Sequence, residues 1–547
     1  MTATAAASAA RPQAAATRVW DALGRHIDGV AIGTTMAALH ERGALAYLAG
    51  RDRTEFGVLR DRLAANPGFL HVALRLLADQ GWVARQGEPG TDRMTIAPTA
   101  RGRVVLTQLA RAYAGAVRGL DQACESLANG DDLTRLARRD WGLPGGGIPP
   151  GVRRQVLSHL DGHLIVPVMH ALSSGDIDLA TNPGAAGVLA RAGWAQAEAG
   201  PDREPPWLTP DGEIALALAG QYRYPVTYLP LLRQVPDLLF GAPRPPADGE
   251  ETHLDRELDL RFSGEVFAAA CRDPFLRLAL PLFDAERLDP QPALVVDAGC
   301  GDGTLLEVLY AAVRDRTARG RHLAERPLVM VGVDPSPVAR RMASARLARA
   351  GVPHEILDGD IADPAGLDRA LAARGLDARD ALHVCKSAIH DRAYAEPRPE
   401  ATDAPRAGTQ QGSVPPAGAP PPGAGAYAPP DGSAIPASAV ALDLARLFRR
   451  WLPVTRRHGW LVIEAHSAPA AVLAGLIGRT HATVLDATHG YACQYPVEPG
   501  VFAWAARAGG FVSRGHAEPG AATLGHTILT IDHFVPADQA SHEAQVL

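Results

Sequence analysis

The sequence has almost no lysine: 54 residues are Lys or Arg, and Lys386 is the only lysine among them. It also has no excess of positive charge, because 60 acidic residues give a formal net charge of −6. Surfaces that bind nucleic acid or an anionic membrane are normally basic. The composition therefore argues against both classes of partner.

Long apolar runs and paired cysteines are missing as well. No stretch of about 18 residues is apolar and free of charge, so we expect no membrane-spanning helix. The five cysteines are scattered and form no CxxC pair, which argues against a disulfide framework or a thiolate zinc site and predicts a reducing, cytoplasmic location. Residues 1–17 lack the basic and apolar segments of a signal peptide, and we expect a disordered tail there.

The length of 547 residues predicts two or three domains. Residues 30–105 place apolar side chains at helical spacing, with a helix-stop signal at Asn66-Pro67-Gly68. A Gly-Trp pair, a polar loop and the strand-like segment MTIAP follow. Three helices followed by a short β wing are typical of a winged helix.

Part of this pattern recurs later in the chain. Gly81-Trp82 in LLADQGWVARQ matches Gly193-Trp194 in VLARAGWAQAE, and Pro98 matches Pro210 at the same offset. These matches predict a degenerate internal duplication.

We therefore expect two winged-helix-like units, over residues 18–115 and 116–250. The expected recognition helix, HVALRLLADQ, has only one Arg and one Asp, which is too little positive charge to bind DNA. A lid over a small-molecule site, or a homodimer contact, suits these units better.

Residues 251–547 alternate between strands and helices, which predicts an α/β, Rossmann-like domain with a parallel sheet covered on both faces. The expected strands lie in ALVVDAGC, LVMVGVD, HEILDGDI, ALHVCKSAI and GWLVIEAH. Residues 396–436 are rich in Pro and Gly, and we expect a disordered insertion there.

The strongest local motif is Asp297-Ala-Gly-Cys-Gly-Asp-Gly303, directly after a strand and before a helix. Its glycines let the backbone turn tightly and approach a ligand. Asp334 ends the second strand, where a carboxylate can accept ribose hydroxyls, and Asp360-Ile361 follows the third, where a carboxylate can accept from an adenine amino group. A dinucleotide fold would instead carry GxGxxG.

The pattern DxGxGxG resembles the first motif of class I S-adenosylmethionine-dependent methyltransferases. The resemblance implies a seven-stranded core and S-adenosyl-L-methionine as cofactor. The expected cofactor-binding residues are Asp297, Gly299, Gly301, Gly303, Asp334, Asp360 and Ile361.

Three further polar segments follow later strands and converge on the same edge of the sheet. They contain His390-Asp391, Glu464 with His466, and the run from Asp486 through His489 to Gln494. Imidazole, carboxylate and amide oxygen suit an iron or manganese ion with open positions. Alternatively, His390 is a metal-free general base, and Glu464 and His466 only orient their neighbours. Lys386 is either a solvated cation or the partner of a substrate carboxylate or an active-site acid.

Several longer strings occur here in one order, including HVCKSAIHDRAY, the run ending in GWLVIEAH, and DATHGYACQYPVE. Together they resemble the metal-dependent C-methyltransferase domains of polyketide loading modules of the apratoxin and saxitoxin type, over about residues 255–515. The resemblance implies a mononuclear Fe or Mn centre with His489 and Gln494 as ligands. His390 or Asp391 is the further ligand. Because this chain is one residue shorter at 387–392 than the S-F-L-D-H-x-R of the family, that choice stays open.

The resemblance thus implies methylation at the α-carbon of a malonyl-type thioester on an acyl carrier protein, or of a related dicarbonyl acid. His390 or His466 would remove the α-proton. Two alternatives stay open: an O-methyltransferase with His390 as base, and a winged-helix regulator that senses S-adenosylmethionine.

Overall fold

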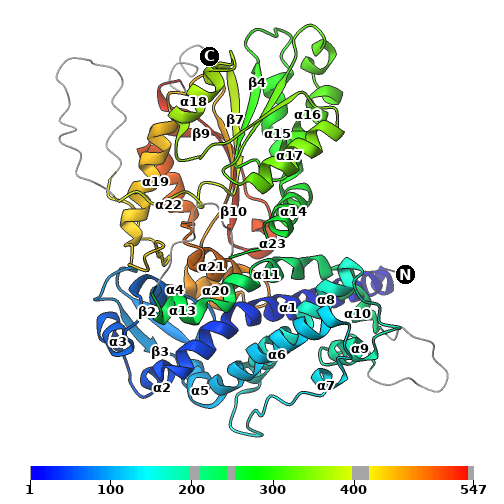
Figure 1. Ribbon diagram of the computed structural model, residues 1–547, viewed down its shortest axis with the longest axis vertical. Helices are drawn as coiled ribbons and strands as arrows, with labels where there is room; N and C mark the ends of the chain where they lie inside the picture. The colour runs from blue at the N-terminus through cyan, green and yellow to red at the C-terminus, as the bar shows by residue number, and fades with distance from the viewer. Residues whose placement is uncertain (1, 197–207, 243–252, 397–417, 540–547) are drawn as a thin grey trace.

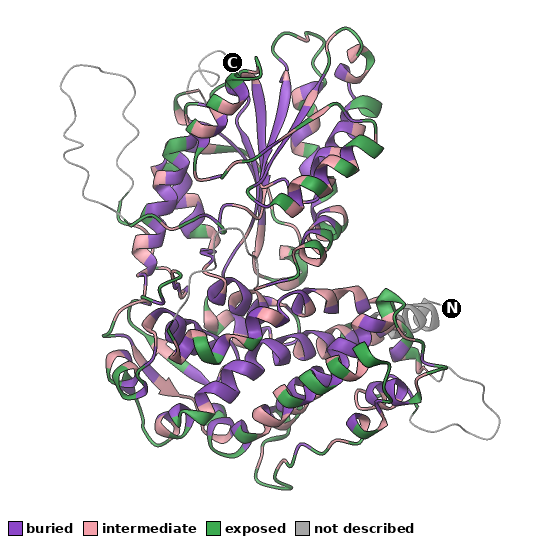
Figure 2. Cartoon of the chain, viewed as in Figure 1, coloured by how far each residue is buried: buried purple, intermediate pink, exposed green. Residues whose placement is uncertain are grey.

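The computed structural model describes residues 2–196, 208–242, 253–396 and 418–539. A helical N-terminal region lies against one end of a large sheet flanked by helices (Figure 1). Figure 2 shows the strands of that sheet buried along most of their length. No helix among the described residues has the length and hydropathy needed to span a membrane.

Three long helices form the frame of the N-terminal region: α1 (Thr2–Glu41), α6 (Ala110–Asn129) and α8 (Pro150–Ser174). Shorter helices complete it: α2 (Ala44–Ala49), α3 (Phe56–Leu63), α4 (Pro67–Asp79), α5 (Ala100–Val104), η1 (Val105–Leu109), α7 (Thr134–Ala137), α9 (Pro183–Ala190), α10 (Pro210–Ala217), η2 (Ala219–Tyr222), α11 (Arg223–Thr227), α12 (Leu229–Arg233) and α13 (Val235–Phe240). The prediction of a disordered tail over 1–17 is wrong for residues 2–17, which belong to α1. Alanine has the highest helix propensity, and the tail is rich in alanine.

A small antiparallel sheet, in the order β1-β3-β2, completes the first unit. Its strands are β1 (Thr54–Glu55), β2 (Val83–Gln86) and β3 (Thr95–Pro98). The helical N-terminal region is confirmed, and the winged-helix assignment of its two units stays a prediction.

The Gly-Trp turn is repeated in three dimensions. Gly81 and Gly193 have φ of 71° and 74°, and the Trp82 and Trp194 carbonyls each accept a 3.0 Å bond, from Thr99 N and Thr209 N. The match between Pro98 and Pro210, however, is out of register.

Strand pairing sets the true register: Val83 pairs with Pro98, while Ala195 pairs with Leu208. The second connection is two residues shorter, so Leu208, and not Pro210, is the counterpart of Pro98. The repeated turn, and not the repeated proline, supports the duplication.

The large sheet has seven strands in the order β6-β5-β4-β7-β8-β10-β9, which confirms the expected α/β fold. The strands are β4 (Leu294–Ala298), β5 (Val329–Val333), β6 (His354–Leu357), β7 (Ala381–Lys386), β8 (Trp460–Ala465), β9 (Phe511–Ala517) and β10 (Leu529–Pro536). The first five are parallel, and β10 is antiparallel to both β8 and β9.

Helices cover both faces of this sheet (Figure 1). One face packs on α15 (Arg272–Ala279), α16 (Thr304–Arg316) and α17 (Pro337–Arg349), and the other on α18 (Pro364–Ala372), α19 (Ala437–Trp451) and α22 (Pro499–Ala508). The remaining elements are α14 (Arg256–Val266), η3 (Phe267–Cys271), η4 (Leu280–Phe283), η5 (Arg319–His322), η6 (Ala378–Asp380), α20 (Ala470–Gly475), α21 (Ala482–Tyr491) and α23 (Ala521–Leu524).

One helix of the C-terminal half belongs to the N-terminal core. Val484, Ala487 and Tyr491 of α21 are buried in the same apolar cluster as the residues of α1 and α4. The Tyr491 hydroxyl is also 2.9 Å from Thr35 Oγ1 of α1. The two halves of the chain therefore share α21.

The Pro/Gly-rich insertion is only partly as expected. Residues 397–417 lie outside the described residues, but for 418–436 the prediction of disorder is wrong. Tyr427 and Ala428 are buried, and the Ala424 carbonyl accepts a 2.8 Å bond from Arg75 Nη1. Composition alone could not foresee that partners elsewhere in the chain would satisfy this backbone.

Candidate active site

The glycine-rich loop after β4 adopts backbone conformations that favour glycine. Gly299, Gly301 and Gly303 have φ of 85°, 54° and 80°. The loop also passes close to the chain that follows β7, since a Cβ built on Gly299 would lie 2.5 Å from Ala388 Cβ. Glycine is therefore required there by conformation and by space.

Two buried carboxylates flank this loop. Asp334 Oδ2 accepts a 3.1 Å bond from Gly301 N, and its Oδ1 accepts a 2.9 Å bond from Ser336 N. Burial raises the pKa of Asp334. Asp297 is 1% exposed and its Oδ1 has no partner among the described residues; burial, with Asp334 nearby, raises the pKa of Asp297 well above its usual value. An unpartnered buried oxygen suits a ligand that donates a hydrogen bond.

The third expected position is more open. Asp360 is exposed and its Oδ1 accepts a 2.8 Å bond from Ala362 N. Ile361 is buried, and its carbonyl accepts a 2.9 Å bond from Trp451 Nε1. The seven residues expected to hold the cofactor thus follow β4, β5 and β6 in turn, and we refer to them as the donor edge.

Two supports of the donor edge were not foreseen. Arg346 of α17 bonds Asp302 Oδ2 at 2.6 Å and Glu307 Oε2 at 3.0 Å, which fixes the loop from below. Helix α14 covers it from the other side, because a Cβ on Gly264 would lie 2.8 Å from Thr304 Oγ1. Arg346 lies in no motif, and nothing in the local sequence around Gly264, which is part of the string SGEVFAAACRDPFLRLALPLFD, reveals this contact.

The second group of residues follows β7 and β8. His390 Nδ1 is hydrogen-bonded to Glu464 Oε1, and both side chains are buried. Burial disfavours the charged imidazolium, but the Glu464 carboxylate, helped by Asp391, outweighs it and raises the pKa of His390. The Glu464 side chain also accepts a 3.2 Å bond from Ile389 N, which orients this turn.

Helix α21 and the segment that follows it bring two more polar groups to this point. The ring centroids of His390 and His489 are 4.7 Å apart, and Tyr495 N donates a 2.7 Å bond to the His390 carbonyl. Gln494 Nε2 donates a 2.8 Å bond to Asp391 Oδ1. His390, Asp391, His489 and Gln494 therefore lie together, and with Glu464 we call them the acceptor edge.

Two side chains of the acceptor edge can still bind a ligand. Gln494 Oε1 is buried without a partner within the described part of the chain. Burial, followed by the nearby His390, lowers the pKa of His489 well below its usual value, so its ring is neutral and can accept or ligate. Across the described ranges, no group of three or more His, Cys, Asp and Glu side chains is arranged to hold a metal ion.

Lys386 lies at the end of β7 with its Nζ 2.7 Å from Ser263 Oγ of α14. Burial lowers the pKa of Lys386, although the carboxylates of Asp259 and Glu464 oppose this effect. Asp259, also on α14, accepts a 3.3 Å bond from the Tyr228 hydroxyl. Asp259, Ser263 and Tyr228 were not foreseen because they precede the first strand of the sheet.

His466 lies close by but differs from His390. Its Nδ1 is 3.1 Å from the Val497 carbonyl and its Nε2 is 2.8 Å from Thr530 Oγ1. With both nitrogens occupied, the ring has no free position to remove a proton. This arrangement favours the orienting role for His466.

Backbone strain marks both segments of the acceptor edge. Among the described residues, only three non-glycine residues have positive φ, and two of them are Ser387 at 54° and Cys493 at 60°. Ser387 follows Lys386, and Cys493 precedes Gln494. Strained residues persist where their surroundings determine the conformation, which is common at active sites.

A buried ionic network holds α21 in place from the N-terminal region. Arg75 of α4 is 2.8 Å from Asp486 Oδ2 of α21 and 2.9 Å from Asp79 Oδ1. All three side chains are at most 10% exposed. Asp486 lies one helical turn before His489, so Arg75 acts on the position of His489.

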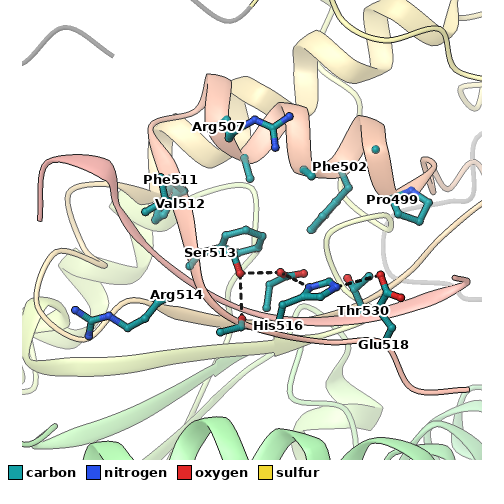
Figure 3. Close-up of a pocket in the computed structure, with 16 residues that line it drawn as sticks. Pro499, Phe502, Arg507, Phe511, Val512, Ser513, Arg514, His516, Glu518 and Thr530 are labelled. Atoms are coloured by element: carbon teal, nitrogen blue, oxygen red, sulfur yellow. Dashed lines mark hydrogen bonds and ion pairs between the residues drawn. The ribbon is translucent and has the colours of Figure 1, made fainter. Parts of the chain in front are cut away.

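A separate cavity of about 560 Å³ lies between α22 and β9 (Figure 3). Its wall includes Phe502 and Phe511, and a polar row in which Asp532 Oδ1 bonds Ser513 Oγ at 3.0 Å and His516 Nδ1 at 2.8 Å. The donor-edge residues and His390 are not among its lining residues. The cavity approaches the acceptor edge through Thr530, the partner of His466.

Comparison with known proteins adds family matches to this geometry. Residues 251–522 match the family model described as AprA MT2-like domain, and residues 20–85 match that of the AprA N-terminal domain. Comparison with the curated proteins found no match.

Similar solved structures include an O-methyltransferase family 2 protein from Planctomyces limnophilus in complex with apigenin, with 11% identity over 94% of this chain and 95% of that chain and a TM-score of 0.38. They also include the DszA carbon methyltransferase (12% identity, 96% and 93%, TM-score 0.33) and the CurJ carbon methyltransferase (10% identity, 77% and 99%, TM-score 0.32). Likenesses at this level do not bear on substrate or chemistry.

Proposed function

The chain is a methyltransferase of the AprA MT2-like family, and on this premise we propose that it methylates the α-carbon of a malonyl-type thioester or a related dicarbonyl acid. S-adenosyl-L-methionine is the donor. The observation that carries the proposal is the closeness of the two edges. Ala388 lies against Gly299 of the donor edge, and His390 follows two residues later.

The donor edge suits the donor on chemical grounds. The unpartnered Oδ1 of Asp297 and the remaining lone pairs of Asp334 can accept hydrogen bonds from the ribose and amino groups of the donor. The glycine loop leaves the backbone free of Cβ atoms where the donor approaches. The donor methyl would then face the residues that follow β7.

The side chains of the acceptor edge are of the types that bind iron or manganese, and they lie close together. Gln494 Oε1 is buried and unpartnered, His489 is neutral, and His390 keeps Nε2 available because Glu464 holds only Nδ1. His489, Gln494 and either His390 or Asp391 would hold the ion, and Glu464 would orient His390. Such an ion supplies Lewis acidity for the negative charge that develops on an enolate oxygen.

Residues of the chain itself can bind the substrate carboxylate, remove the α-proton and exclude water. Lys386 is the only lysine and lies at the end of β7, where its ammonium can pair with the carboxylate of a malonyl group. When Asp391 is the ligand, His390 can take the α-proton, because Glu464 stabilises the resulting imidazolium. The N-terminal helices against α21 exclude water from this point.

A second candidate function rests on the same His390–Glu464 pair. A histidine held by a buried carboxylate is also the arrangement of a metal-free general base. It would deprotonate a hydroxyl, and the product would be an O-methyl ether. A carrier-protein substrate and a homodimer through the N-terminal region remain predictions in either case.

One experiment separates these functions. Purified protein is incubated with the donor and with either malonyl-carrier protein or a panel of 2-oxo acids and phenols. Each reaction is run with added Fe(II) or Mn(II) and again after chelation, and the products are analysed by mass spectrometry. We expect a methylated malonyl or 2-oxo product. When the substrate is α-deuterated, this product should have lost one deuterium, and chelation of the metal should prevent its formation. A product methylated on oxygen, unaffected by chelation, would establish the second function instead.

A further inference from the structure

A cavity of about 690 Å³ in the N-terminal region has arginines in its wall and lies away from the active site. It lies between α6 and the loop after α7, with the end of α1 at its side. Three arginines line it, Arg111, Arg118 and Arg139, against a single carboxylate, Asp140. The wall of the cavity is therefore positive, although the chain as a whole has a net charge of −6.

The shape of α6 makes room between two of these arginines. Arg111 and Arg118 are two helical turns apart, a rise of about 10 Å on the same face of α6. Gly115 lies between them, and a Cβ built there would meet no atom within 4 Å. The glycine therefore leaves a notch with a guanidinium at each end.

Arg139 is held in place by hydrogen bonds, and none of the three arginines has an ion pair among the described residues. Arg139 Nη2 donates a 3.0 Å bond to the Gly115 carbonyl, and Nη1 donates a 2.7 Å bond to Gln122 Oε1. Arg111 and Arg118 are exposed, and their side chains have no hydrogen bond or ion pair within the described residues. Burial, with Arg118 among the neighbouring arginines, lowers the pKa of Arg139. An anion bound here would relieve that repulsion.

We propose that this cavity is a binding site for a phosphate monoester. Three guanidinium groups against one carboxylate leave two positive charges, which match the charge of about −2 on a phosphate monoester at neutral pH. Guanidinium forks bind phosphate oxygens in pairs. The volume is within the range of small-molecule sites and exceeds what a phosphate alone fills, so the phosphate is carried on a larger body.

Calorimetric titration with phenyl phosphate tests the site, with phenyl sulfate as the probe of lower charge. We expect phenyl phosphate to bind more tightly than phenyl sulfate, and binding to weaken as salt is added. Arg118→Gln should weaken phenyl phosphate by roughly tenfold or more, the value of a charge-assisted hydrogen bond. Arg93→Gln, an exposed arginine outside the cavity, should leave it unchanged.

A phosphoserine peptide of mixed sequence, titrated in the same way, separates two sources of the phosphate. Tighter binding than phenyl phosphate indicates a modified protein, and weaker binding indicates a small metabolite; in both cases Arg118→Gln must weaken it. Equal affinity of the wild type and the Arg118→Gln protein for phenyl phosphate, with unchanged melting temperatures, would overturn the proposal.

Discussion

The donor edge and the acceptor edge lie at the same end of one sheet but are built in different ways. The donor edge comes from one stretch, residues 297–361, whose residues lie at the ends of β4, β5 and β6 in sequence order. The acceptor edge joins the chain after β7 to α21, and α21 is buried in the N-terminal core. The donor edge is thus a property of the sheet, whereas the acceptor edge depends on two regions remaining docked.

The largest expected effect tests whether the two edges are separable. His489→Ala should abolish turnover, a loss of about a thousandfold or more, because an electrostatic group at the reacting centre is removed. Donor affinity, measured by calorimetry, should change little because the donor edge is intact. The matched control is His322→Ala on η5, an exposed histidine that should retain activity. Loss of donor binding in His489→Ala would show that the edges are one unit.

The next effect tests the docking itself. Arg75→Met removes the guanidinium that is shared by Asp486 and Asp79 and leaves buried carboxylates unpaired. We expect a loss of about 3–5 kcal/mol in the free energy of unfolding, and lower turnover by the remaining folded protein at an unchanged donor Kd. Denaturant unfolding and single-turnover kinetics measure the two effects.

Arg60→Met is the control for this variant. Arg60 is partly exposed and pairs with two exposed carboxylates, Asp61 at 2.8 Å and Asp92, and each of these surface ion pairs is worth at most about 1 kcal/mol. Equal stability losses in the two variants would contradict a special role for the Arg75 network. Normal turnover in Arg75→Met would show that His489 is positioned without it.

The same contrast explains what the sequence could predict. Gly299, Gly301, Gly303 and Asp334 were foreseen because their function depends on local order: a strand, a turn that needs glycine, and the next strand end. His489 and Gln494 were placed at this edge of the sheet because their segment follows a later strand, but only the family resemblance singled them out as metal ligands, since nothing in their spacing reveals that α21 folds back beside β7.

The features that could not be predicted depend on contacts between segments that are far apart in the sequence. Arg75 and Asp259 reach the site from segments that carry no motif, and nothing in the local sequence around Ser263 places it beside Lys386. The ordered part of the insertion depends on donors such as Arg75 to its backbone, which composition does not encode. The antiparallel strand β10 was likewise not foreseen, because residues 518–528 separate it from β9, a connection longer than the short loops that mark a hairpin.

A third prediction tests the contact between the two edges. Gly299→Ala combines strain at a φ of 85° with a clash against Ala388, and it should weaken donor binding by roughly tenfold and shift the turn that carries His390. Gly351→Ala, at a φ of 64° with open space around it, imposes the strain alone, about 1 kcal/mol. Comparable donor Kd values for the two variants would mean that the close approach of Ala388 to Gly299 does not affect donor binding.

The smallest effect concerns pH at the contact between α1 and α21. Burial raises the pKa of Asp28 to about 8, and Thr483 and Val484 of α21 lie beside it. Between the unfolded value of 3.8 and about 8, the folded protein holds one proton more than the unfolded chain, so stability falls as pH rises across this window. From pH 5 to pH 8 the loss is at most about 4 kcal/mol. Asp28→Asn, whose amide does not titrate, should remove this contribution from the pH slope measured by urea unfolding, whereas Asp237→Asn at an exposed site should leave the wild-type slope unchanged. The same pH slope in the wild type and in Asp28→Asn would mean that water reaches Asp28, and hence that the contact supporting the acceptor edge is looser than that of the donor edge.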